Sequence, residues 1–163
     1  MSRHTAEVSW TRGGARFIDG RYSRGHVWRF DGGAEIAASS SPHSVPLPYS
    51  RREAVDPEEA FVASVSSCHM LWFLSIAAKR GHAVEEYLDD AEGYLEQDGE
   101  GRMSMMRIVL RPRIVFAADT PAPADDIRTM HEAAHHACFI ANSVKTAISV
   151  LSALAALPSG SAS

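Results

Sequence analysis

Cysteine is scarce in this chain, and its scarcity limits what sulfur chemistry the protein can carry out. The 163 residues include only two cysteines, Cys68 and Cys138. Two cysteines cannot build the framework of several disulfides that stabilises small secreted domains. They can form a single bond, and in a cytosolic protein such a bond is usually catalytic or redox-sensing.

Other missing features exclude further classes of protein. The chain has no run rich in Lys and Arg, and its formal net charge is −4, so charge gives no case for binding nucleic acid or an anionic membrane. The first ten residues, MSRHTAEVSW, contain no apolar signal-peptide core. The apolar run Ala60–Ala78 is short and interrupted for a membrane span, and two glutamates precede it. We therefore expect a cytoplasmic protein with no membrane partner and no nucleic-acid partner.

The composition that is present suits one globular domain. Apolar residues make up 45% of the chain and charged residues 22%, which is ordinary for a soluble protein. A chain of 163 residues is long enough to bury one core. We predict a single domain over residues 1–163, with a flexible tail over about 158–163, where the sequence reads PSGSAS.

The pattern of residues predicts an α+β fold. Short strands are expected over 5–12, 25–33 and 34–39, followed by a long loop rich in Pro and Ser. Two long antiparallel strands over 83–97 and 102–116 should form a hairpin around the turn DGEG. A second helix is expected over 120–137, opened by prolines and acidic residues. The segment 138–154 should begin as a helix or turn and end as a strand.

The central element is a helix from Pro57 to about Arg80. Asp56 is a natural N-cap and Gly81 a natural residue to follow the helix end. Because the helix is apolar on nearly every side, we expect it to be buried centrally, with antiparallel sheets packed around it. Cys68 lies about 15 Å along this helix, beyond the reach of the favourable dipole at its first turn. A reactive thiolate there needs another positive group, and without one Cys68 is an inert buried thiol.

Two motifs favour the reactive alternative. The segment DPEEAFVASVSSC, which ends at Cys68, resembles the Asn/Asp-Pro-Glu…Cys signature of the OsmC/Ohr superfamily of osmotically inducible and organic hydroperoxide resistance proteins. The segment HHACFIANSVK around Cys138 resembles the second cysteine region of the same family. The order of the expected elements also agrees, and the resemblance extends from Ala6 to Ser149.

The resemblance implies a thiol-dependent peroxidase with an OsmC-like fold and an intertwined homodimer. Cys68 would attack the peroxide and become a sulfenic acid, and Cys138 would condense with it to form a disulfide. A dithiol or a thioredoxin-like reductant would then restore both thiols. The family also uses an arginine from the N-terminal region, for which Arg24 aligns best and Arg21 competes, and the glutamate of the Pro-Glu motif, which is Glu58. Without the resemblance, these residues are a solvated loop charge and a first-turn helix acid.

Helix geometry adds an expectation about assembly. Glu58 lies ten residues before Cys68, which is too far along a straight helix for both to share a site within one chain. Two such helices packed antiparallel across a twofold axis would bring Glu58 of one chain toward Cys68 of the other.

Some residues depart from the family pattern or have two interpretations. Many relatives have proline after the second cysteine, where this chain has Phe139. His69 is either a core histidine or a residue that tunes the substrate pocket, and Trp72, near the helix face of Cys68, is either core or the best candidate to line that pocket.

A histidine cluster leaves one alternative for metal. The cluster comprises His131, His135, His136 and Cys138. His131 and His135 share a helix face and with Cys138 could bind zinc, but their spacing without a suitably placed Glu is a weak pattern, and a solvated helix face is the simpler interpretation. No metal, flavin or haem motif is found, so we expect a redox centre made of sulfur alone and no cofactor. The alternative function is a non-catalytic redox-sensing or small-molecule-binding protein on the same fold.

Overall fold

The computed structural model describes residues 1–152 of the chain. Its contacts divide the chain into two compact units, Met1–Phe61 and Val62–Ser163. The long helix α1 (Pro57–Lys79) crosses the boundary between them, so the single domain predicted over 1–163 stays a prediction. The tail predicted to be flexible, about 158–163, lies outside the described residues.

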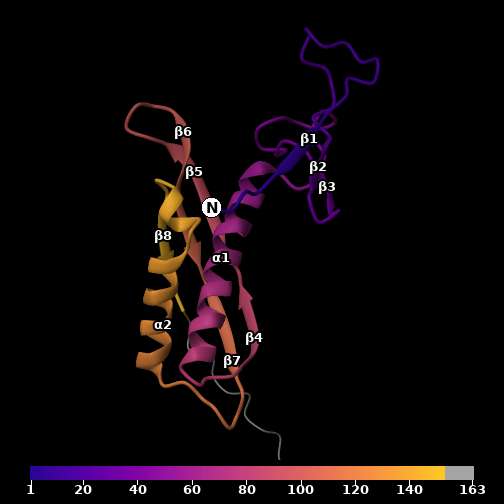
Figure 1. Cartoon of the computed structure of the whole chain (residues 1–163). Helices are drawn as coiled ribbons and strands as arrows, with labels where there is room; N and C mark the ends of the chain where they lie inside the picture. The colour runs from indigo at the N-terminus through magenta and orange to yellow at the C-terminus, as the bar shows by residue number, and fades with distance from the viewer. Residues whose placement is uncertain (153–163) are drawn as a thin grey trace, which may run out of the picture. The chain divides into compact units, whose positions relative to one another are not determined.

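The first unit contains a three-stranded antiparallel sheet in the order β1-β2-β3 (Figure 1). Its strands are β1 (Ala6–Ser9), β2 (His26–Phe30) and β3 (Glu35–Ala38). Arg29 in the middle strand forms an ion pair with Glu7 at 2.7 Å on one side and another with Glu35 on the other side. The three residues lie opposite one another in the strand register, where opposite charges favour pairing. The three strands predicted near the N-terminus are confirmed.

Helix α1 begins and ends with local signals that the sequence carries. The N–H of Glu59 donates to Asp56 Oδ1 at 2.7 Å, and the N–H of Asp56 donates to Glu59 Oε2 at 3.1 Å. This reciprocal pair satisfies N–H groups that have no partner within the helix. At the other end Gly81 has a φ of 84°, a left-handed conformation that glycine adopts without strain. Both predicted helix ends are therefore confirmed.

One face of α1 is fully buried within the described chain. Its buried side chains recur every four residues, at Val65, His69, Phe73 and Ala77. On another face Leu71 is 60% exposed. In the described part of the chain, α1 is the one helix long and apolar enough to cross a membrane, a property that the core helices of soluble proteins share. Burial of α1 on all sides, as the sequence suggests, stays a prediction.

The first four of the strands after α1 form two antiparallel pairs, β5 with β6 and β4 with β7. Their bounds are β4 (Val84–Asp89), β5 (Glu92–Gln97), β6 (Met103–Leu110) and β7 (Pro112–Phe116). The predicted hairpin is confirmed, but each of its two long strands is broken once. The break in the second strand, between β6 and β7, lies beside Pro112, which has no N–H to donate to a neighbouring strand. There the N–H of Arg111 donates instead to Asp89 Oδ1 at 2.6 Å.

The prediction of antiparallel sheets is wrong for one pair of strands. Strand β8 (Ala147–Val150) lies beside β6 and runs parallel to it, with Ile148 opposite Ile108. The chain reaches this position through α2 (Ala124–Ala137) and the short 3-10 turn η1 (Ala141–Ser143). A long connection containing a helix is what parallel neighbours require. The second helix and the turn followed by a strand are both confirmed.

Helices α1 and α2 lie side by side and run in opposite directions along the strands of the second unit (Figure 1). Arg80, just beyond the end of α1, donates from Nη1 to Thr129 Oγ1 at 2.6 Å. An apolar cluster joins the two helices to β7 and contains Phe73, Ala77, Ile114, Met130 and Ala134. This packing fixes where the remaining residues of the two helices meet, including the segments that carry the cysteines.

Candidate redox site

The two cysteines, 70 residues apart in sequence, lie in contact. Cys68 is half-buried in the middle of α1, and Cys138 is buried at the residue that ends α2. The thiol of Cys68 is close enough to that of Cys138 to raise its pKa, and both are free cysteines. The antiparallel packing of α1 on α2 thus brings together Cys68 and Cys138, the two residues predicted from the sequence to react with each other.

The surroundings of Cys138 change the pKa of its thiol in opposite directions. Burial and the neighbouring thiol of Cys68 raise the pKa of Cys138. The backbone N–H of Ala141 donates to Cys138 Sγ at 3.4 Å and, together with the backbone at Ile140, partly offsets that rise in pKa. The net effect keeps Cys138 protonated at neutral pH, as a thiol beside its partner.

An open cavity of about 580 Å³ lies over Cys68. It is lined by Ser64, Ser67, Cys68, Leu71, Trp72, Ser75, Phe139 and Ile140. None of these lining residues is charged. The helical members fall three or four residues apart along one face of α1, a spacing that the sequence displays. Of the two residues predicted for a substrate pocket, Trp72 lines this cavity beside Cys68 and His69 does not. The remaining lining residues were not predicted, because a face of small and apolar residues resembles ordinary core.

Trp72 and Phe139 form the aromatic wall of this cavity. Their ring centroids are 5.5 Å apart and the ring planes are at 88°, an edge-to-face contact. Phe139 is 68% exposed and directly follows Cys138. The residue that departs from the family pattern therefore contributes side-chain surface at the mouth of the site.

His69 is turned away from the cavity and into the protein. It is 1% exposed, and its Nε2 lies 3.0 Å from Nδ1 of His131, which is 5% exposed. Burial, followed by the charges of His131 and His135, lowers the pKa of His69 to about 4, and burial lowers the pKa of His131 to about 4. Both rings are thus neutral at physiological pH, and His69 is not among the residues that line the cavity over Cys68.

The predicted charged residues lie in the first unit. Arg24 donates from Nη1 to the carbonyls of Gly20 and Tyr22, at 2.6 Å each, and its guanidinium stacks over the Tyr22 ring at 3.8 Å. The backbone N–H of Arg21 donates to Asp19 Oδ1 at 3.0 Å. Glu58 is in the first turn of α1. The catalytic roles of Arg24, Arg21 and Glu58 stay predictions.

The histidine cluster of α2 divides between the inside and the surface. His131 is buried, whereas His135 and His136 are exposed. Within residues 1–152, no group of three His, Cys, Asp or Glu side chains is arranged to hold a metal ion.

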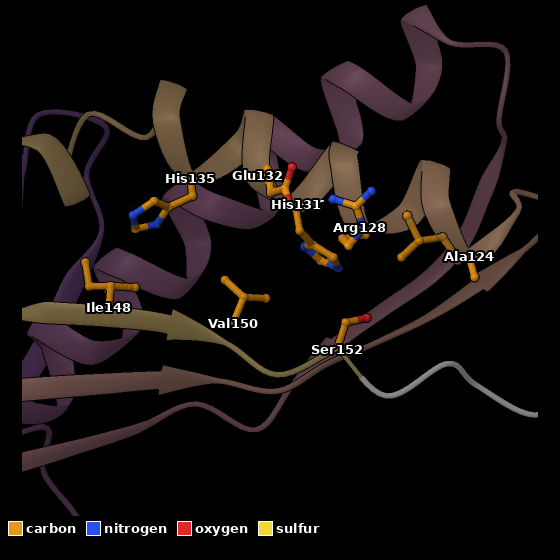
Figure 2. A pocket seen from close by; sticks show the side chains of 9 residues that line it. Ala124, Arg128, His131, Glu132, His135, Ile148, Val150 and Ser152 are labelled. Carbon is orange, nitrogen blue, oxygen red and sulfur yellow. Dashed lines mark hydrogen bonds and ion pairs between the residues drawn. The ribbon is translucent and has the colours of Figure 1, made fainter.

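A second cavity of about 500 Å³ lies between α2 and β8. Figure 2 shows His131 and His135 projecting from α2 on the side that faces Ile148 and Val150 of β8. Arg128 and Glu132, also on this cavity, are paired with each other at 2.8 Å. His131 therefore lies between this cavity and α1.

The fold and the paired thiols agree with one family. The model of the OsmC-like protein family matches residues 50–152, and the chain belongs to that family. The match includes both cysteines, α1 and all of the strands that follow it. The resemblance found from the two motifs is confirmed.

Solved structures with the same fold match most of the chain. An OsmC-like protein of unknown function from Vibrio cholerae is 50% identical, with a TM-score of 0.92, and the match covers 94% of this chain and 100% of that one. An organic hydroperoxide resistance protein OsmC from Legionella pneumophila is 15% identical with a TM-score of 0.66, over 96% of this chain and 98% of that one.

The organic hydroperoxide resistance protein OhrB of Bacillus subtilis is similar at greater distance. It is 16% identical with a TM-score of 0.63, and the match covers 93% of this chain and 98% of that one. At such identities the likeness establishes the fold. Among curated proteins, none matches the chain significantly.

Proposed function

We propose that this protein is a cysteine-based peroxidase that reduces organic hydroperoxides, and also the smaller hydrogen peroxide, with Cys68 as the attacking thiol and Cys138 as the resolving thiol. The observation that carries the proposal is that the only two cysteines of the chain lie close enough for Cys68 to raise the pKa of the Cys138 thiol. Two neighbouring thiols can form a disulfide when their backbone positions allow the specific geometry of that bond.

The first step consumes the peroxide. The thiolate of Cys68 attacks one oxygen of the O–O bond, which breaks, and the other oxygen leaves as an alkoxide that takes up a proton to become the alcohol. Cys68 is oxidised to a sulfenic acid and the peroxide is reduced. The half-exposed position of Cys68 at the open cavity gives a peroxide access to this sulfur.

The second step protects the oxidised cysteine. The sulfur of Cys138 attacks the sulfenic sulfur, an S–S bond forms, and hydroxide leaves and combines with the proton of Cys138 as water. A dithiol or a thioredoxin-like protein then reduces the disulfide by thiol exchange. This cycle needs no metal or organic cofactor, since sulfur alone carries the electrons.

The uncharged cavity supports an active site completed by a second chain. A thiolate and a peroxide oxygen are stabilised by a guanidinium, yet no residue that lines the cavity carries a charge. The face of α1 that bears Leu71 is open, and Phe139 beside it is 68% exposed. In the proposed homodimer, this apolar surface is covered by a second copy, which brings its Glu58 and the arginine, Arg24 or Arg21, to Cys68.

The cavity lining also supports the class of substrate. Leu71, Trp72, Phe139 and Ile140 offer apolar surface next to Cys68, which suits the hydrocarbon part of an organic hydroperoxide. A cytoplasmic location, where thiols are kept reduced and the reductant is available, fits such a cycle.

The first experiment measures peroxide consumption with a dithiol as reductant, alongside intact mass. Wild type should turn over and pass through an intramolecular disulfide. Cys68→Ser should abolish consumption. Cys138→Ser should consume one equivalent of peroxide and then stop as a sulfenic acid or a more oxidised product. Undiminished turnover by Cys68→Ser would refute the proposal.

The same measurement separates the peroxidase from its main alternative, a redox sensor or small-molecule-binding protein on this fold. A sensor would undergo a single stoichiometric oxidation and would not turn over when the dithiol is supplied in excess. The peroxidase consumes many equivalents under the same conditions.

The shared site is tested by mixing chains. Cys68→Ser and Glu58→Ala homodimers should each be impaired. Heterodimers of the two should recover activity, because one of their two sites combines an intact Cys68 with an intact Glu58. Glu59→Gln provides the matched control, since it alters the neighbouring acid of the same helix turn. If mixing restores nothing, Glu58 does not act across the interface.

A further inference from the structure

His69 and His131 form a directional contact between the two helices that carry the cysteines. The rings are stacked, with centroids 5.3 Å apart and planes at 10°, and Nε2 of His69 lies 3.0 Å from Nδ1 of His131. Phe73 packs against the His131 ring at 4.4 Å. With exposures of 1% and 5%, the two rings are shielded from water.

The contact lies close to both thiols along the chain. His69 directly follows Cys68, and His131 precedes Cys138 by seven residues, which is about two turns of α2. The side-chain hydrogen bond between Arg80 and Thr129 also joins this part of the fold, but it is exposed and lies at the far end of α1. Besides the two thiols themselves, the histidine pair is therefore a buried polar contact between the cysteine-bearing helices.

If this buried position only had to be filled, two histidines would destabilise the fold relative to two apolar side chains. Nδ1 of His69 and Nε2 of His131 are buried and have no hydrogen-bond partner among the described residues. Leaving such atoms unpaired costs free energy, and an apolar pair of similar volume avoids that cost. What two histidines add is direction, because a single hydrogen shared between two ring nitrogens fixes one register of α2 against α1, whereas apolar side chains can slide.

We infer that His69 and His131 are a positioning pair for the two cysteines, holding α2 in the register that keeps Cys138 against Cys68. The inference rests on the proposed function for its role in the cycle. Within that cycle the pair acts on the second step, because sulfenic acid formation needs only Cys68 and the peroxide, whereas disulfide formation needs Cys138 at the right place and angle.

The test compares four variants with wild type. His131→Leu and His69→Leu each remove one side of the contact, the double variant removes both, and His131→Gln keeps a group able to form a hydrogen bond. His136→Gln is the control, since this histidine is exposed on the same helix. Urea unfolding is measured for each protein. If a single Leu variant does not fold, the double variant, which leaves no unpaired histidine, still reports on the pair.

The first arm uses diamide, an oxidant that converts two neighbouring thiols to a disulfide while it is reduced to the hydrazine. This arm needs no peroxidase activity. We expect each single Leu variant to form the Cys68–Cys138 disulfide about tenfold more slowly, the rate equivalent of one net hydrogen bond. The double variant should be no slower than the singles, because the two residues act as a unit. His131→Gln should recover part of the rate, and His136→Gln should match wild type.

The second arm follows one equivalent of an organic hydroperoxide, with sulfenic acid trapped by a dimedone probe and disulfide followed by intact mass. Sulfenic acid should form within about twofold of the wild-type rate in every variant, while its conversion to disulfide slows as in the diamide arm. An unchanged diamide rate in the Leu variants would overturn the positioning role, whatever the peroxide result. A wild-type protein that reacts with diamide but not with peroxide would refute the proposed peroxidase and leave the positioning role supported.

Discussion

The N–H of Ala141 donates a hydrogen bond to Cys138 Sγ at 3.4 Å, just where α2 ends and η1 begins. This donor favours a thiolate, but burial and the contact with Cys68 outweigh it and raise the pKa of Cys138. The resolving cysteine is therefore held as a neutral thiol that must lose its proton when the disulfide forms.

The raised pKa of Cys138 predicts how the second step depends on pH. Because the thiolate is the attacking species, conversion of a preformed sulfenic acid to the disulfide should accelerate with rising pH. The increase should continue beyond about pH 8.5, where an unperturbed cysteine is half ionised. Single-turnover intact mass across this range measures it, with Cys138→Ser as the blank. A rate that levels off below pH 8 would show that the thiol is more acidic than its surroundings imply.

Asp89 is predicted to stabilise the fold through two hydrogen bonds. Its Oδ2 accepts from the hydroxyl of Ser66 on α1, and its Oδ1 accepts from the N–H of Arg111 at 2.6 Å. Asp89→Ala should lower the free energy of unfolding by about 2 kcal/mol or more, because both donors lose a charged acceptor in a partly buried site. Urea denaturation measures the change.

Asp90→Ala is the matched control for this substitution. Asp90 pairs with Arg113 at 2.7 Å, but both side chains are more than half exposed. Such a surface ion pair contributes less than about 1 kcal/mol. Equal losses from the two substitutions would contradict the anchoring role of Asp89.

Phe139 is predicted to favour bulky substrates within the proposed peroxidase. Phe139→Ala removes one side of the edge-to-face contact with Trp72 and reduces the apolar wall near Cys68. The value of kcat/KM for an aromatic hydroperoxide should fall by about two- to tenfold, as expected for one aromatic contact, while that for hydrogen peroxide should change little. Leu88→Ala, an exposed apolar residue of β4 outside that cavity, is the control. A similar loss for both peroxides would mean that Phe139 does not select by size.

Local signals explain what could be predicted from the sequence. Asp56 and Glu59 cap α1 through bonds between near neighbours, and Gly81 ends the helix by its own backbone freedom, so both ends follow from a few adjacent residues. The hairpin of β5 and β6 could be predicted in the same way, because the turn at Asp98 and Gly101 lies between two periodic segments.

Contacts between distant segments could not be predicted in the same way. The parallel pairing of Ile108 with Ile148 depends on how the intervening helix packs, and no local pattern encodes it. The histidines illustrate the same limit. Their spacing placed His131 and His135 on one helix face, but which of them turns inward to meet His69 depends on the packing of α2 against α1. The pairing of Cys68 with Cys138 could be predicted only from the resemblance to a family, because a family resemblance implies contacts between distant segments.

The buried histidine pair predicts that the protein loses stability in mild acid. In the folded protein His69 and His131 have pKa values of about 4, whereas an unfolded histidine titrates near 6.5. Between these values the unfolded chain binds more protons than the folded one, so the free energy of unfolding falls as pH decreases from 6.5 to 4. The slope for each ring approaches about 1.4 kcal/mol per pH unit, and the charge of His135 on α2 acts in the same direction on His69.

Urea unfolding at several pH values measures this loss, and the double variant His69→Gln/His131→Gln isolates its source. Glutamine keeps polar groups in place but does not titrate, so the variant should lose much less stability than wild type between pH 6.5 and 4. Carboxylates with lowered pKa, such as Glu92 and Asp98, are present in both proteins and cancel in the difference. Parallel pH profiles for the two proteins would show that the histidines are already charged in the folded state, which is incompatible with a neutral pair sharing one hydrogen.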